Sequence, residues 1–143
     1  MAKSTTTCNN LLKLIFNATA WANIADNAAS SPATNLYLSL HTADPGVGGT
    51  QSTSETSYTN YARIAVIRTS AGWTVATNTA SNAALAQFAI CGATGATVTY
   101  VAIGMLSTGA GIILYSGALN SSLAVANGIQ PQFAIGALVV TET

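Results

Sequence analysis

The chain has 143 residues, of which half are hydrophobic and only 6% are charged, and its net charge is zero. Four Lys and Arg side chains cannot neutralise a run of phosphates, which argues against nucleic-acid binding, and they form no polybasic patch for an anionic membrane. An apolar chain with so few charges has the opposite of a disordered composition. Because neutral surfaces associate readily, we expect a protein that works assembled in many copies or on a larger surface.

The first 34 residues differ in pattern from the rest, and we predict a short helix followed by an arm. Asn9 or Asn10 is a suitable helix cap, and Leu11–Phe16 has apolar side chains at helical spacing. The arm, Ala18–Thr34, carries one large aromatic residue, Trp21. The first residues lack the apolar segment of a secretory signal, so we expect synthesis in a reducing cytoplasm, with Cys8 and Cys91 as free thiols.

Residues 35–143 have the pattern of an antiparallel β-sandwich. Leu36, Leu38 and Leu40 alternate with polar side chains, which is typical of a half-buried strand. The further predicted strands are Tyr61–Thr69, Trp73–Thr77, Asn82–Ile90, Thr97–Met105, Gly111–Leu119, Ala124–Asn127, Ile129–Ile135 and Gly136–Thr141. About eight short strands with frequent turn residues favour a sandwich or barrel over parallel βαβ units.

A turn and a long loop follow the first strand. Pro45 and Gly46 suit the centre of a type II turn, after which Val47–Thr59 is rich in Gly, Ser and Thr. A loop of this length in a compact domain is usually functional or mobile.

Residues capable of catalysis are few. His41 and Asp44, with Glu55 folding back from the loop, form the best candidate for a metal or acid–base site, but two carboxylates rarely suffice for tight metal binding. No serine lies in a G-x-S-x-G motif, and the cysteines lack metal-ligand spacing. We therefore predict a protein that is not an enzyme and has no catalytic residue, metal or cofactor.

Five side chains are candidates for contact with a partner: Phe16, Trp21, Tyr58, Tyr61 and Arg63. Tyrosine and arginine are enriched at interfaces, but the tyrosines could equally cover the sheet while Arg63 pairs with Glu55. Phe16 and Trp21 could dock on another subunit or close one end of the domain.

Several motifs resemble those of small structural proteins of tailed bacteriophages. They are Leu38–Gly46 (LSLHTADPG), Ser54–Arg63 (SETSYTNYAR), Gly72–Trp73, Leu114–Leu119 (LYSGAL), Gly128–Phe133 (GIQPQF) and Gly136–Leu138. The sequence is most similar to the capsid cement, or decoration, proteins of short-tailed phages. The resemblance implies a jelly-roll fold on the outside of the virion capsid, in contact with the major capsid protein and with further copies, as a dimer or higher homo-oligomer.

Two alternatives remain at this stage. One is a tail or tail-fibre component of the same virion. The other is a small jelly-roll module that binds carbohydrate, for which Tyr58, Asn60 and Glu55 are the plausible set of residues.

Overall fold

The computed structural model describes residues 4–21 and 33–143, and these form two compact units. The helix unit comprises the described parts of residues 1–35, 66–86 and 133–143, and the long-strand unit comprises residues 36–65 and 87–132. This division differs from the predicted boundary at residue 34, because the chain leaves the helix unit after the first segment and returns to it twice. That residues 35–143 fold without the helix stays a prediction.

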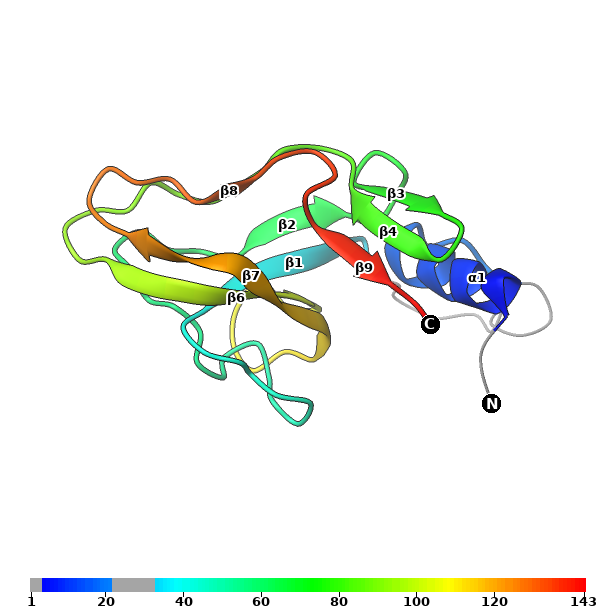
Figure 1. The fold of residues 1–143 in the computed structure, drawn as a ribbon, viewed down its shortest axis with the longest axis horizontal. Helices are drawn as coiled ribbons and strands as arrows, with labels where there is room; N and C mark the ends of the chain where they lie inside the picture. Colours follow the sequence, from blue (N-terminus) through cyan, green and yellow to red (C-terminus); the bar gives the residue numbers. More distant parts are fainter. Residues whose placement is uncertain (1–3, 22–32) are drawn as a thin grey trace. The chain divides into compact units, whose positions relative to one another are not determined.

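The described residues contain one helix and nine strands, numbered in chain order, and Figure 1 labels all of them except β5. The helix is α1 (Thr5–Phe16), and the strands are β1 (Asn35–His41), β2 (Ile64–Ile67), β3 (Trp73–Ala76), β4 (Thr79–Asn82), β5 (Ala86–Gln87), β6 (Ala96–Gly104), β7 (Ile113–Val125), β8 (Gln132–Phe133) and β9 (Val139–Thr141). The strands form sheets in the orders β2–β1–β6–β7, β3–β4–β9 and β5–β8. The predicted class, antiparallel all-β with a short N-terminal helix, is confirmed.

Helix α1 begins earlier than the sequence pattern predicts. Ser4 is the N-cap, and its hydroxyl accepts a hydrogen bond from the Thr7 N–H at 3.2 Å. Asn9 and Asn10 lie inside the helix, so the prediction that one of them caps it is wrong. Serine is as good a cap as asparagine, and the threonines between them are tolerated in the first turn. The helix ends at Phe16, with Asn17 as its C-cap.

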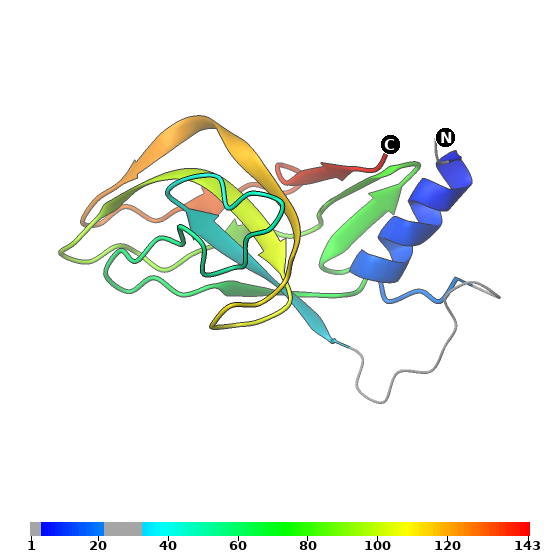
Figure 2. The same ribbon diagram turned by 90° about the horizontal axis from the view of Figure 1, so that it is seen from below.

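The buried side of α1 forms part of the core of the helix unit. Cys8, Leu12 and Phe16 are buried, and the Phe16 ring lies 4.6 Å from the Trp73 ring, centroid to centroid. Trp73 is itself fully buried at the start of β3. The helix therefore packs on β3 and β4, beside which it lies in Figures 1 and 2.

Arg68 follows β2 directly and binds the end of this helix. Its guanidinium donates to the backbone carbonyls of Ile15 at 2.6 Å and Leu14 at 2.7 Å, in the last turn of α1, and to that of Ala33. These helix carbonyls have no partner within the helix and carry partial negative charge, so a cation stabilises them. Burial lowers the pKa of Arg68, although guanidinium remains charged in proteins.

Asn82 organises the other end of the helix unit. Its buried side-chain amide donates to the carbonyls of Ala84 and Ala134, both at 2.8 Å, and its side-chain oxygen accepts from the Leu138 N–H at 2.9 Å. The predicted strand Asn82–Ile90 is interrupted here. The amide turns the chain out of β4, and the pattern of alternation did not reveal that interruption.

In the long-strand unit, β1 is paired with β6, and β6 is paired with β7. Leu38 lies opposite Ile103 and Leu40 opposite Val101, so the predicted alternation of β1 produces one apolar face. Strand β7 continues past the predicted end at Leu119 and takes in Ala124 and Val125, the first two residues of the stretch expected as a separate strand. It pairs irregularly with β6 between Ala118 and Leu123, where Figure 2 shows it bending sharply.

We predict that Phe16→Ala lowers the free energy of unfolding by about 3–5 kcal/mol, because it leaves a cavity against Trp73. Chemical denaturation followed by tryptophan fluorescence measures the loss. Lys13→Ala, on the same helix but outside its buried set, is the matched control and should change stability by less than about 0.5 kcal/mol. Equal, small effects of the two variants would show that the helix is dispensable.

Candidate functional site

The long loop after β1 folds back along that strand. The predicted turn is present, with Gly46 at φ +70° and its N–H bonded to the Asp44 carboxylate at 2.9 Å. Further on, Thr42 N–H donates to the Ser54 carbonyl at 2.8 Å and Thr56 N–H to the Leu40 carbonyl at 2.9 Å. The loop thus acts as a strand partner for the end of β1.

Glu55 and Arg63 form the central ion pair of the long-strand unit. Two guanidinium nitrogens of Arg63, Nε and Nη2, each lie 2.7 Å from a Glu55 carboxylate oxygen. The Arg63 side chain is 2% exposed and that of Glu55 18%. Arg63 also donates to the carbonyls of Leu106 at 2.9 Å and Gly109 at 2.7 Å. One guanidinium therefore connects the loop after β1 to the turn between β6 and β7.

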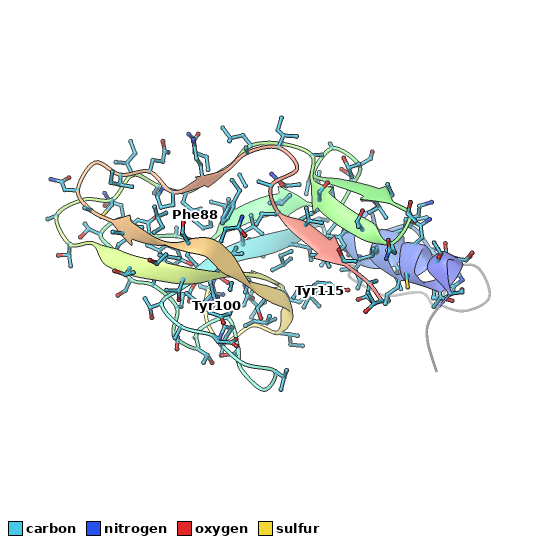
Figure 3. All side chains as sticks on the ribbon, in the orientation of Figure 1. Phe88, Tyr100 and Tyr115 are labelled. Carbon is cyan, nitrogen blue, oxygen red and sulfur yellow. The ribbon has the colours of Figure 1, made fainter. Side chains whose placement is uncertain are left out.

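Tyr61 adds a second connection to the same carboxylate. Its hydroxyl donates to Glu55 Oε1 at 2.8 Å and accepts from the Leu40 N–H at 3.1 Å. The ring stacks on Phe88 with centroids 6.2 Å apart, and Phe88, which is labelled in Figure 3, is buried. Burial is the largest cause that raises the pKa of Tyr61, so the hydroxyl stays protonated as a donor.

His41 and Ser39 lie on the polar side of β1. The His41 Nδ1 atom is 2.8 Å from the Thr53 carbonyl, and Nε2 is 2.9 Å from the Ser39 hydroxyl. Because a carbonyl only accepts, neutral His41 carries its proton on Nδ1 and accepts from Ser39 at Nε2. This spacing is that of a nucleophile and its base, yet both side chains have no exposed surface. The pair can hold the loop but has no access to a substrate.

Gln51 is a structural residue that the sequence analysis missed. It is fully buried, and its side-chain oxygen accepts a hydrogen bond from the Leu106 N–H at 2.9 Å. Its main-chain N–H donates to the Gly111 carbonyl at 2.9 Å. A Cβ on Gly104 would lie 2.2 Å from the Gln51 side chain, so a larger residue there would displace the Gln51 amide. A lone glutamine in a polar loop gives no sequence signal of such burial.

The candidate metal or acid–base set does not assemble. His41 is committed to Ser39 and Thr53, Glu55 to Arg63 and Tyr61, and Asp44 to the Gly46 turn. Among residues 4–21 and 33–143, no three His, Cys, Asp or Glu side chains are grouped so that they could hold a metal ion. Cys8 and Cys91 are free, buried thiols, as predicted. In the described part of the chain, no helix has the length and hydropathy needed to cross a membrane.

The five predicted contact residues lie in different surroundings. Phe16 and Tyr58 are buried in their own units, Trp21 and Tyr61 are half-buried, and Arg63 is bonded to Glu55. The internal alternative for Arg63 is thus confirmed. The role of the five in binding a partner stays a prediction. Tyr61 and Arg63 are bonded to Glu55, and of the other three only Trp21 is partly exposed.

The residues proposed for carbohydrate binding do not form an exposed platform. The Tyr58 ring is 2% exposed and its hydroxyl donates to the Ala89 carbonyl at 3.0 Å. Asn60 donates to the Ile90 carbonyl at 3.4 Å, and Glu55 is bonded to Arg63. Stacking on a sugar requires an open aromatic face, which Tyr58 does not provide.

These features define a β-rich protein whose polar side chains are used to hold its own loops. Residues 2–141 match the family model described as podophage GP4 fiber I protein gp80. The chain belongs to this family and is a structural protein of short-tailed phages. No curated protein matches the sequence.

We predict that Arg63→Met destabilises the protein by about 3–5 kcal/mol, because it leaves the Glu55 carboxylate buried without its partner. The double variant Glu55→Gln/Arg63→Met should recover part of that loss. Arg63→Lys keeps the charge but not the two-point geometry, so it should lose less stability than Arg63→Met does. Additive losses in the double variant, measured by urea denaturation, would contradict a direct coupling.

Stability should also depend on pH through His41. Burial lowers the pKa of His41 in the folded chain below its ordinary value of 6.5. Between the lowered pKa and pH 6.5, the unfolded chain therefore binds more protons than the folded chain does. The free energy of unfolding is then at its full value above pH 6.5 and falls on acidification, by at most about 1.4 kcal/mol per pH unit. In His41→Gln the same titration between neutral and mildly acid pH should be flatter. An identical slope would assign the effect to other groups.

Proposed function

We propose that this chain is a fibre subunit of a short-tailed phage virion, that it is not an enzyme, and that it acts by assembly with other copies and other virion proteins. The match of residues 2–141 to a fibre protein family carries the proposal. It favours a fibre over the capsid cement role that the sequence motifs suggested, while both place the protein in the virion.

The way the chain uses its charges supports a role in assembly. Residues 69–141 contain no charged side chain, and Glu55, Arg63 and Arg68 are engaged within their own units. Large apolar side chains are nevertheless exposed in both units: Val47, Ile67, Leu85, Ile90, Leu106, Ile112, Ile129, Ile135 and Val139. An uncharged surface with apolar side chains is suited to burial against another protein.

Electron microscopy of virions with and without the protein tests the proposed location. We expect density attributable to this chain to disappear from the fibres. Loss of density across the capsid shell would instead support a cement protein bound to the major capsid protein. Unchanged virions would overturn both.

Attachment should depend weakly on salt, because salt screens exposed charges and this chain has few of them. The measurement is the amount of protein retained on purified virions between low salt and about 1 M, where the Debye length is about 3 Å. A surface-charged protein added to the same virions is the control for salt damage. A steep loss with salt would show that the contact is ionic.

A further inference from the structure

Strand β9 is at the edge of the three-stranded sheet of the helix unit. The sheet has the order β3–β4–β9, so within the described residues β9 has one neighbour, β4. The ladder places Val140 opposite Ala80, with Val139 and Thr141 opposite Ser81 and Thr79. The other side of the strand is an unpaired edge, which is a ready site for the addition of a further strand.

The hydrogen bonds show which residues of β9 face outward. The Leu138 carbonyl accepts from the Asn82 N–H at 3.3 Å, and the Glu142 N–H donates to the Asn78 carbonyl at 2.9 Å. Main-chain groups alternate in direction along a strand, so those of Leu138, Val140 and Glu142 point to β4. The N–H and C=O groups of Val139 and Thr141 therefore point away from the sheet.

This edge lacks the features that usually prevent strands from pairing. Natural edges are protected by charged side chains, proline or bulges, whereas β9 consists of two valines and a threonine. Val139 is 59% exposed, while Leu138 beside it is 6% exposed. The strand thus keeps one set of side chains in its own core and presents the other outside.

Asn82 fixes the chain that leads into this edge. Its amide binds the Ala134 carbonyl and the Leu138 N–H, and its main-chain carbonyl accepts from the Gly136 N–H at 2.9 Å. The segment so held also exposes Ile135, at 69%. An edge held in place before binding loses little conformational entropy when a partner is added.

We propose that β9 pairs antiparallel with β9 of a second copy of this chain, an inference that rests on the proposed role in assembly. The twofold axis passes at Val140, so that the two Val140 residues face each other. Val139 of each copy then exchanges hydrogen bonds with Thr141 of the other. The result joins two three-stranded sheets into one continuous sheet.

The charge distribution favours a second copy as the occupant. Antiparallel pairing of identical strands places like residues near each other, which is unfavourable when they carry charge. Here the segment from residue 69 to Thr141 is uncharged, and in this register Glu142 lies opposite Leu138 rather than opposite the second Glu142. The β-branched Val140 pair is of the kind that stabilises adjacent strands.

Val139→Pro tests the edge directly. Proline removes an N–H that points outward and makes no bond to β4, so the fold should persist while the pairing is blocked. By sedimentation velocity, the purified full chain should dimerise, and the variant should dimerise at least about 10-fold more weakly. Val139→Thr keeps the N–H and the branched side chain and should behave like the parent. Circular dichroism and thermal unfolding confirm that each variant is folded.

Cysteine cross-linking tests the register. Val140→Cys should form a disulfide between copies on mild oxidation, because facing residues of a non-hydrogen-bonded pair have Cα atoms about 4.5 Å apart. Thr141→Cys, which faces Val139 instead, is the control and should cross-link slowly. The native thiols are 3% and 1% exposed and contribute little background.

A parent chain that stays monomeric, a dimer that Val139→Pro leaves intact, or equal cross-linking at both positions would overturn the proposal. These measurements use the isolated protein. They are therefore independent of where microscopy finds it on the virion, and failure of the pairing leaves the proposed fibre role standing.

Discussion

The ion pair between Glu55 and Arg63 is the interaction on which the long-strand unit depends most. A two-point carboxylate–guanidinium contact has fixed geometry, and here the remaining guanidinium donors bind two carbonyls in the turn after β6. The loop after β1, the β6–β7 turn and Tyr61 all meet at this pair. Because the pair is largely removed from water, loss of either partner leaves an uncompensated charge, and the three segments lose their common anchor together.

The helix unit uses the same principle with a different arginine. Arg68 satisfies carbonyls at the end of α1, and Asn82 satisfies three main-chain groups at the other end of the unit. In the long-strand unit, the buried Gln51 side chain likewise binds a main-chain group, the Leu106 N–H. Among the described residues, the charged side chains of Glu55, Arg63 and Arg68 are thus committed to holding loops and chain ends together.

Regular alternation made much of the fold predictable from sequence. Strand β1 has the expected start and end, and the turn at Pro45–Gly46 was evident from residue type. The pairing of Glu55 with Arg63 was one of two readings of a short segment. What could not be predicted arises from contacts between residues far apart in the chain, such as Asn82 with Ala134 or Phe16 with Trp73. Such contacts leave no local pattern. The family match, rather than any side chain, shows that the chain is a structural protein of short-tailed phages.

The scarcity of basic residues also limits the number of sites at which trypsin can cleave this protein. Trypsin cleaves after lysine and arginine, and beyond Arg68 the sequence offers it no site. Within the described residues the basic side chains are Lys13, inside a helix, and the two arginines, each hydrogen-bonded to main-chain carbonyls. Proteolysis requires a locally unfolded segment, and cleavage at either arginine would first require its hydrogen bonds to be broken. A virion exposed to enzymes of trypsin-like specificity thereby contains a component with few cleavage sites.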